Sequence, residues 1–386
     1  MTDPVRWIWN RPTWPELRYD QDALIEPLGR ARDMAGRLRG RADAIGEDEL
    51  TVIVGDIWAG NAVATSAIEG EVLDMAAVRS SVANRLGATP ARVAAAPRNV
   101  EGLLDVMNDA TANWQSELSE ERLISWQAAL FPEGRSGLRR VETGTFRTRG
   151  DPMRIVSGPA GKEIVHYEAP PFAAVRAEMR SFLDWFNGSK DSAAVDGILR
   201  AGLAYLWFES IHPFADGNGR IGRAIIDMTV SQDMRLASRL HGISMELQRR
   251  QTDYRSALNH ALRGTGDATD WLVWFVGAFW ESCRTSIAII DEPLVRAKFW
   301  NQHRNVELNA RQRKALNRML AAGPGKFEGG MTPQKYIALT KAKYITANRD
   351  LVDLVDKRLL VREGAGRSTY YNLTIPGWGW VSKRTN

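Results

Sequence analysis

The segment from Asp191 to Met228 constrains the fold more than any other part of this 386-residue chain. Its apolar residues recur at helical spacing in two runs, first Ile198, Leu199, Leu203, Leu206 and Trp207, and then Ile221, Ala224, Ile225 and Met228. The first helix should stop at His212, because a residue that precedes proline disfavours helical backbone. The turn Gly217-Asn218-Gly219 then opens onto the second helix. Since most of the remaining chain also has helical spacing, we predict a mainly α fold.

Several residues between the two predicted helices suit phosphate chemistry. A glycine turn at a helix N-terminus presents backbone N–H groups and a favourable dipole to an anion. Arg220 and Arg223 are three residues apart, so they share one helix face and form a polyphosphate clamp. Asp216 offers a hard carboxylate oxygen for Mg²⁺, and a neutral His212 can accept a hydroxyl proton. Each feature alone is more often structural, but here they fall within 12 residues.

Residues 212–223, His-Pro-Phe-Ala-Asp-Gly-Asn-Gly-Arg-Ile-Gly-Arg, resemble the signature of the Fic family, His-x-Phe-x-Asp/Glu-Gly-Asn-Gly-Arg-x-x-Arg. The resemblance implies a helical core and the transfer of AMP from ATP to a Ser, Thr or Tyr hydroxyl of a protein. The related Doc kinases depart from the Gly-Asn-Gly part, so the intact glycines argue against a Doc-like kinase. The roles that the resemblance implies are general base for His212, Mg²⁺ ligand for Asp216, α-phosphate contacts for Asn218 and the amides of Gly217 and Gly219, and outer-phosphate contacts for Arg220 and Arg223.

A second motif, residues 65–70, ends an earlier helical stretch. Gly70 suits the position after a helix, which leaves Glu69 in the last turn, where its charge opposes the helix dipole by about 0.3–1 kcal/mol. The segment resembles the Fic inhibitory motif, Ser/Thr-x-x-x-Glu-Gly/Asn. That resemblance implies that Glu69 pairs with Arg223 and fills the space of the ATP γ-phosphate, with Thr65 as its anchor. An exposed glutamate without a role and a glutamate that positions water for AMP removal are the alternatives.

Two short β-like runs, residues 143–147 and 154–158, surround a turn and resemble the Fic flap hairpin. The resemblance implies that a target segment adds to its edge as a strand, alongside Thr145, Phe146, Ile155 and Val156. A plain structural hairpin is the alternative. Tyr254 and Asn259 are candidates for the adenine side of the site, although Tyr254 also suits core packing.

The last part of the chain is basic. From residue 301 onward there are 16 Lys and Arg against 6 Asp and Glu, giving +10, which leaves 35 − 40 = −5 for residues 1–300. Leu316 marks one helix, Thr332-Pro333 opens a second and Thr346 caps a third, before a hairpin around residues 364–366. This order resembles a winged helix-turn-helix, which binds either DNA or another protein. The candidate DNA contacts are Asn348, Arg349, Arg362 and Arg367.

These patterns predict four regions: an N-terminal helical extension with the inhibitory motif (1–98), a Fic catalytic domain with a β-hairpin flap (99–292), a small winged-helix domain (300–375) and a tail (376–386). The lone Cys283 excludes an intrachain disulfide, and no signal peptide or membrane span is expected, so a cytoplasmic setting is the default. We predict a protein AMP transferase that uses ATP and Mg²⁺. A DNA-binding regulator that senses nucleotide and a de-AMPylating enzyme are the alternatives. Self-modification and a homodimer are left open.

Overall fold

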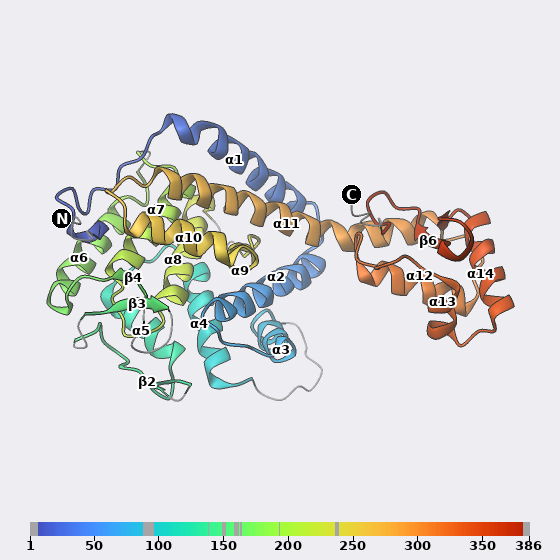
Figure 1. Cartoon of the computed structure of the whole chain (residues 1–386), viewed down its shortest axis with the longest axis horizontal. Helices are drawn as coiled ribbons and strands as arrows, with labels where there is room; N and C mark the ends of the chain where they lie inside the picture. The colour runs from blue at the N-terminus through green and yellow to red at the C-terminus, as the bar shows by residue number, and fades with distance from the viewer. Residues whose placement is uncertain are drawn as a thin grey trace. The chain divides into compact units, whose positions relative to one another are not determined.

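The computed structural model describes residues 7–87, 96–137, 139–148, 152–157, 162, 164–192, 194–235 and 239–380, apart from the side chains of Asp48, Ser157 and Arg367. The chain divides into two compact units, residues 1–287 and 288–386. The described part is mainly helical with small hairpins, as predicted. Figure 1 shows the course of the chain from the N-terminus to the C-terminal helices and hairpin.

The first unit is an assembly of helices with two short antiparallel hairpins (Figure 1). Its described helices are η1 (Ile8–Asn10), α1 (Asp22–Asp43), α2 (Glu47–Ile68), α3 (Met75–Arg85), α4 (Arg98–Ala112), α5 (Glu120–Leu130), α6 (Phe172–Gly188), α7 (Gly197–Ile211), α8 (Asn218–Met234), α9 (Ile243–Arg249), α10 (Gln251–Leu262) and the first part of α11 (Thr269–Gln302). The hairpins pair β1 (Arg135–Ser136) with β2 (Arg139–Arg140), and β3 (Arg154–Ser157) with β4 (Ile164–Glu168).

Helices α7 and α8 form the centre of this unit. From residue 198 to the end of α7 every side chain is buried, and α8 is buried over most of its length. Burial on all faces means that the other helices of the unit cover this pair. Arg32 on α1 ties the start of α7 to the end of α8, since it donates to Asp196 at 2.9 Å and to Asp233 at 2.8 Å.

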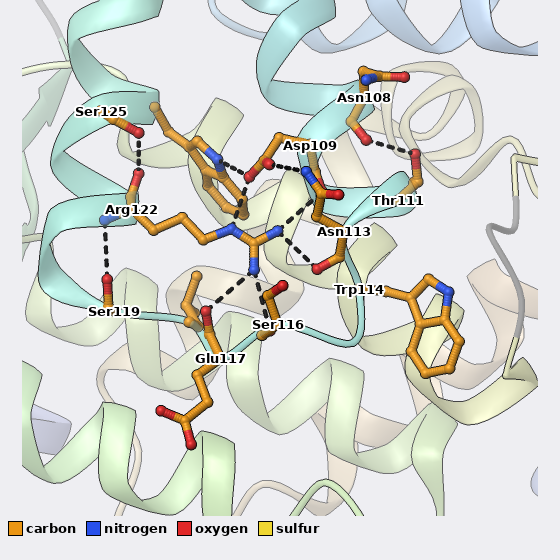
Figure 2. A network of polar contacts seen from close by, with 12 residues as sticks. Asn108, Asp109, Thr111, Asn113, Trp114, Ser116, Glu117, Ser119, Arg122 and Ser125 are labelled. Atoms are coloured by element: carbon orange, nitrogen blue, oxygen red, sulfur yellow. Dashed lines mark hydrogen bonds and ion pairs between the residues drawn. The ribbon is translucent and has the colours of Figure 1, made fainter.

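Helices α4 and α5 are joined by a braced turn (Figure 2). Arg122 donates to the Asp109 carboxylate at 2.7 Å and to the carbonyls of Asp109 and Asn113 at 2.9 and 3.1 Å. The last carbonyls of a helix lack partners within it, and the guanidinium supplies them here. Arg122 thus closes the turn at residues 113–119 that separates the two helices. The brace fixes α5, whose end reaches the candidate site.

An aromatic N-terminal arm, residues 7–15, packs onto the helical body. Trp7 and Ile8 are buried, and Trp7 meets the Tyr167 ring edge-on at 5.4 Å. The indole N–H groups of Trp9 and Trp14 donate to the Glu168 carbonyl and the Glu178 carboxylate at 2.7 and 2.8 Å. The arm therefore contacts β4 and α6, next to the second hairpin.

Helix α2 passes the length and composition test for a membrane span over Glu49–Ile68, but 56% of its apolar window is buried inside the protein. Trp58, Ala59 and Ala62 of α2 belong to the same core cluster as α7 and α8. A core helix of this kind meets the same test without crossing a membrane.

The second unit has the predicted order of three helices and a hairpin. Helices α12 (Ala310–Ala322), α13 (Pro333–Thr340) and α14 (Tyr344–Asp356) precede β5 (Leu360–Glu363), η2 (Gly366–Ser368) and β6 (Tyr370–Leu373). Thr332 caps α13 as expected, because its hydroxyl accepts from the Lys335 amide at 3.2 Å. The predicted cap at Thr346 is wrong: α14 begins at Tyr344, after an extended Lys343. Helix α11 continues through Pro293 to Gln302.

Candidate functional site

The loop between α7 and α8 is held in a defined shape. His212 ends α7 in the left-handed region with φ 50°, and Gly217 has φ 90° just before α8. Such conformations in a non-glycine residue cost about 1–3 kcal/mol and persist where neighbours enforce them. The Asn218 side chain does so, accepting from the Phe214 amide at 2.9 Å and donating to the Phe214 carbonyl at 2.8 Å.

Asn218 therefore differs from its expected role. Both polar atoms of its side chain bond to Phe214, and the residue is buried. A phosphate contact in this conformation falls to the backbone N–H groups at the start of α8, which point out of the helix. The Asn218 side chain holds the loop instead.

A buried arginine outside the predicted motifs also braces this loop. Arg147 is 4% exposed; its Nε donates to the His212 carbonyl at 2.9 Å, and its amide donates to the Pro213 carbonyl at 2.9 Å. Its other contacts are to the carbonyls of Pro170 and Ile211. Sequence reasoning assigned Arg147 to a flap strand and missed this role, because nothing local indicates contacts 65 residues away.

Arg223 lies at the bottom of the site and is 2% exposed. Its NH2 donates to Glu69 Oε1 at 2.7 Å, and its Nε donates to Thr65 Oγ1 at 2.6 Å. A third bond reaches the Thr65 carbonyl at 3.0 Å. The predicted meeting of Thr65, Glu69 and Arg223 is thus present, with α2 and α8 facing each other.

The Glu69 carboxylate lies against the start of α8. A Cβ at Gly219 would clash with Glu69 Oε1 and would stand 3.0 Å from Arg223 NH1. Only a glycine leaves room for an anion this close to the helix N-terminus, where the dipole favours negative charge. Burial by itself raises the pKa of Glu69, but the charge and hydrogen bond of Arg223 outweigh it and lower the pKa below its ordinary value. The carboxylate is therefore ionised at neutral pH and occupies the anion site.

Arg220 has its own acidic partner, which sequence reasoning missed. Its NH1 lies 3.2 Å from Glu71 Oε2, and its guanidinium stacks over the Phe131 ring at 4.9 Å. Asn99 donates to the other oxygen of Glu71 at 2.5 Å. The two arginines at the start of α8 are thus each paired with a glutamate that follows α2, and the two glutamates are two residues apart.

A cavity of about 840 Å³ opens beside these residues. It is lined by Glu69, Glu71, Asp216 and Arg220, together with Arg98, Leu130, Phe131, Glu133 and Arg135 and their neighbours. Its volume lies within the usual range for small-molecule sites. The end of α5 forms part of its wall, so the Arg122 brace indirectly sets its shape.

Asp216 is the residue suited to a hard cation. Its Oδ1 accepts from the Gly217 amide at 2.6 Å, and its side chain reaches the cavity next to Arg220. In the described ranges no cluster of three or more His, Cys, Asp or Glu side chains could hold a metal ion. Mg²⁺ binds proteins through one or two carboxylates together with substrate phosphates and water, so a single aspartate here fits that pattern.

The predicted flap is partly wrong. Phe146 is 2% exposed and packs against Phe214 at 5.2 Å, so it cannot dock a target, and residues 143–147 around Thr145 form no strand. The hairpin instead pairs Ile155 with Tyr167 and Val156 with Val165. Val156 is 47% exposed on β3. Arg263 donates to the Val165 and His166 carbonyls of β4, which leaves β3 as the better edge for strand addition.

The candidates for the adenine side lie elsewhere. Tyr254 is 4% exposed, and its hydroxyl bonds to that of Tyr205 inside the core, where its ring meets Trp274 at 5.9 Å. Core packing therefore accounts for the position of Tyr254, and its adenine role stays a prediction. Asn259 is half-buried on α10 and does not line the cavity.

The predicted DNA contacts belong to the second unit. Arg349 on α14 and Arg362 on β5 are exposed, whereas the Asn348 amide donates to the Tyr344 carbonyl at 3.1 Å. The side chain of Arg367 lies outside the described part of the chain. Tyr344 and Ile345 at the start of α14 are 61% and 82% exposed. The start of α14 is therefore exposed within its own unit.

Comparison with known protein families gives two matches for this chain. Residues 117–229 match the Fic/DOC family, and residues 7–88 match a domain of unknown function, DUF4172. The chain is a Fic/DOC family protein with an N-terminal DUF4172 domain, and the Fic family implies a nucleotide substrate.

One curated relative is a probable protein adenylyltransferase of Aquifex aeolicus, 29% identical over 98 residues, which are 25% of this chain and 27% of that protein. The match thus spans about a quarter of that relative. Two solved structures share the fold. A Fic family protein from Desulfovibrio desulfuricans has a TM-score of 0.53 at 20% identity, covering 94% of this chain and 98% of that one. A Fic domain containing signaling protein from Bacteroides thetaiotaomicron has a TM-score of 0.52 at 15% identity, covering 68% and 96%.

Proposed function

We propose that this protein transfers AMP from ATP to a hydroxyl side chain of a protein. The observation that carries the proposal is the anion site at the start of α8, one loop away from His212, where Gly219 and Arg223 lie against the Glu69 carboxylate and Arg220 pairs with Glu71. Adenylyl transfer needs a phosphate-binding site and a general base close to that site.

The reaction has a simple balance. The target oxygen bonds to the α-phosphorus, the bond from that phosphorus to the bridging oxygen breaks, and pyrophosphate leaves. His212 takes the hydroxyl proton, while the α8 amides and the two arginines offset the charge that grows on the phosphate oxygens. Asp216 would hold Mg²⁺, which supplies further charge neutralisation when bound. The edge of β3 would hold the target segment as an added strand.

Glu69 acts as a brake in this proposal. Its carboxylate fills the anion site, and an ATP phosphate needs the same Arg223. Since the pKa of Glu69 is lowered in the folded protein, the ion pair stabilises the fold above the ordinary glutamate pKa of 4.5 and is lost only as the pH falls below it. Mild acid therefore leaves the brake in place, and release requires movement of the end of α2.

The test uses the whole chain with Mg²⁺ and ATP labelled on either the α- or the γ-phosphate. We expect the Glu69→Gly variant to label itself or a lysate protein from α-labelled ATP and not from γ-labelled ATP. Label from the γ-phosphate would identify a kinase instead. Release of AMP from a previously labelled protein, faster with Glu69 than without it, would favour the de-AMPylating alternative.

Glu71 is expected to lower the transfer rate at the same site, but by less than Glu69 does. Replacing it by glutamine in the Glu69→Gly background frees Arg220, and because the pair is partly exposed we expect about a two- to fivefold rise in transfer rate. Initial rates at sub-saturating ATP measure this. Glu133→Gln, at another acidic residue of the cavity wall, is the matched control and should change little. A lower rate in Glu71→Gln would contradict the restraint.

A second candidate function, DNA binding, rests on the second unit. Its support is the net charge of +10 from residue 301 onward (16 − 6) and the uncovered start of α14. We expect binding of the whole chain to duplex DNA to weaken steeply with salt, and Arg349→Ala to lower the slope of log affinity against log salt by about 1. Fluorescence anisotropy measures this, with Arg318→Ala on α12 as the control. Absence of binding at low salt would exclude this function.

A further inference from the structure

Glu209 is a buried charge that the proposed chemistry has not yet used. It lies on α7, three residues before His212, and is 4% exposed. Within the described ranges no lysine or arginine forms an ion pair with it, and its Oε1 has no hydrogen-bond partner. Its surroundings are Gly222, whose Cβ would stand 3.2 Å from Oε1, and the buried ring of Tyr205. A carboxylate buried without an ion-pairing cation is costly, so Glu209 is a candidate for a role outside stability.

The imidazole of His212 lies beside Glu209. Its Nδ1 lies 3.5 Å from Glu209 Oε2, and this nitrogen is buried without a hydrogen-bond partner. The separation is slightly long for a hydrogen bond, and catalytic contacts of this kind often tighten only when substrate binds. The Glu209 carboxylate and the unpartnered His212 Nδ1 face each other across this distance, and they are complementary if Nδ1 carries a proton.

We propose that Glu209 is a positioning residue for His212. Its carboxylate accepts the Nδ1 proton, which leaves Nε2 without a proton and able to act as the base. When Nε2 takes the proton of the target hydroxyl, the ring becomes a cation, and the Glu209 charge stabilises it. The proton moves from oxygen to Nε2, the oxygen–phosphorus bond forms, and the proton later leaves to solvent. Carboxylate–histidine pairs fix the tautomer in other enzymes by the same physics.

The α7 backbone makes this contact possible. A residue three positions before the helix end lies on the same face, so Glu209 sits beneath the terminal turn. His212 leaves the helix with φ 50°, and the Arg147 bond to its carbonyl holds that conformation. The imidazole is thus fixed from two sides, at its backbone by Arg147 and at Nδ1 by Glu209.

This proposal rests on the proposed function for its kinetic part, so the experiment has two independent readouts. The first is the ¹⁵N spectrum of the imidazoles in the whole chain, with the His212 signal assigned by its absence in His212→Ala. We expect the protein to show the Nδ1–H tautomer for His212, and Glu209→Leu to shift it toward Nε2–H. A proton on Nε2 in the unmodified protein, or an unchanged signal in the leucine variant, would overturn the proposal even if no transfer activity is ever found.

The second readout is kinetic and uses the Glu69→Gly background. Glu209→Gln keeps the shape of the side chain but removes its charge, and we expect kcat to fall about 10- to 10³-fold with little change in KM for ATP. A structural role predicts a less stable protein, whereas we expect Glu209→Leu to unfold at an equal or higher temperature because it removes an unpaired buried charge. Unchanged kcat in both variants would overturn the positioning role.

Discussion

Glu69→Gly is expected to raise the rate of label transfer from α-labelled ATP by about 10- to 150-fold at sub-saturating ATP. The estimate follows from the charge-assisted bond to Arg223, since such bonds contribute about 1.5–3 kcal/mol and 1.4 kcal/mol is a factor of ten. Removing the carboxylate frees both the guanidinium and the N-terminus of α8 for phosphate. Initial rates over a series of ATP concentrations measure the change, which should lie mainly in KM.

The same substitution should make the protein less stable without nucleotide. Arg223 is 2% exposed and would keep only its bonds to Thr65, and a buried charge without its partner destabilises a fold. MgATP should therefore raise the melting temperature of the variant more than that of the unmodified protein. Glu133→Gly removes one negative charge from the same cavity and serves as the control. Equal activation by both variants would mean that general electrostatics, and not the Glu69–Arg223 pair, limits the reaction.

His212→Ala in the Glu69→Gly background is expected to lower the transfer rate by about 10²- to 10⁴-fold. The side chain is the proposed base, and no other described histidine lies in the loop between α7 and α8. The affinity of the variant for ATP should be unchanged, because the arginines and the α8 amides bind the phosphates. Single-turnover rates at saturating ATP, together with calorimetry of ATP binding, separate the two effects.

The control for this second prediction is His260→Ala on α10, where the histidine side chain is 77% exposed. It changes the same residue type away from the loop and should leave the rate unaltered. If His212→Ala retained the full rate, deprotonation by His212 would not contribute to the reaction. Glu209 could then not affect the transfer rate through His212. If ATP binding were lost as well, the imidazole would belong to the phosphate site.

The sequence predicted the structure best where the residues of the site are contiguous in the chain. Residues 212–223 are contiguous, so spacing and the proline at 213 were enough to predict a helix, a glycine turn and a second helix. The basic C-terminal unit was also readable, because Thr332-Pro333 is a local start signal. The meeting of Glu69 with Arg223, 154 residues apart, came only from family resemblance.

The sequence was least informative where contacts are distant or a side chain suits two environments. Phe146 alternates like a strand residue, but its ring fills the core beside Phe214. Arg147 and Glu71 gained their roles from partners 65 and 149 residues away, which periodicity does not record. Glu209 left a local signal, a charge among apolar residues in the last turns of the helix that ends at the loop.

The position of Glu69 on the chain has a consequence for how such a brake responds to its surroundings. A carboxylate tethered at the end of α2 competes with ATP at a fixed effective concentration, on the order of millimolar or higher. Dilution cannot remove a tethered competitor, and the blocked fraction is the same at every protein concentration. A partner that shifts the end of α2 by the length of one side chain would bring that effective concentration close to zero, so contact with the partner would relieve the brake at any protein concentration.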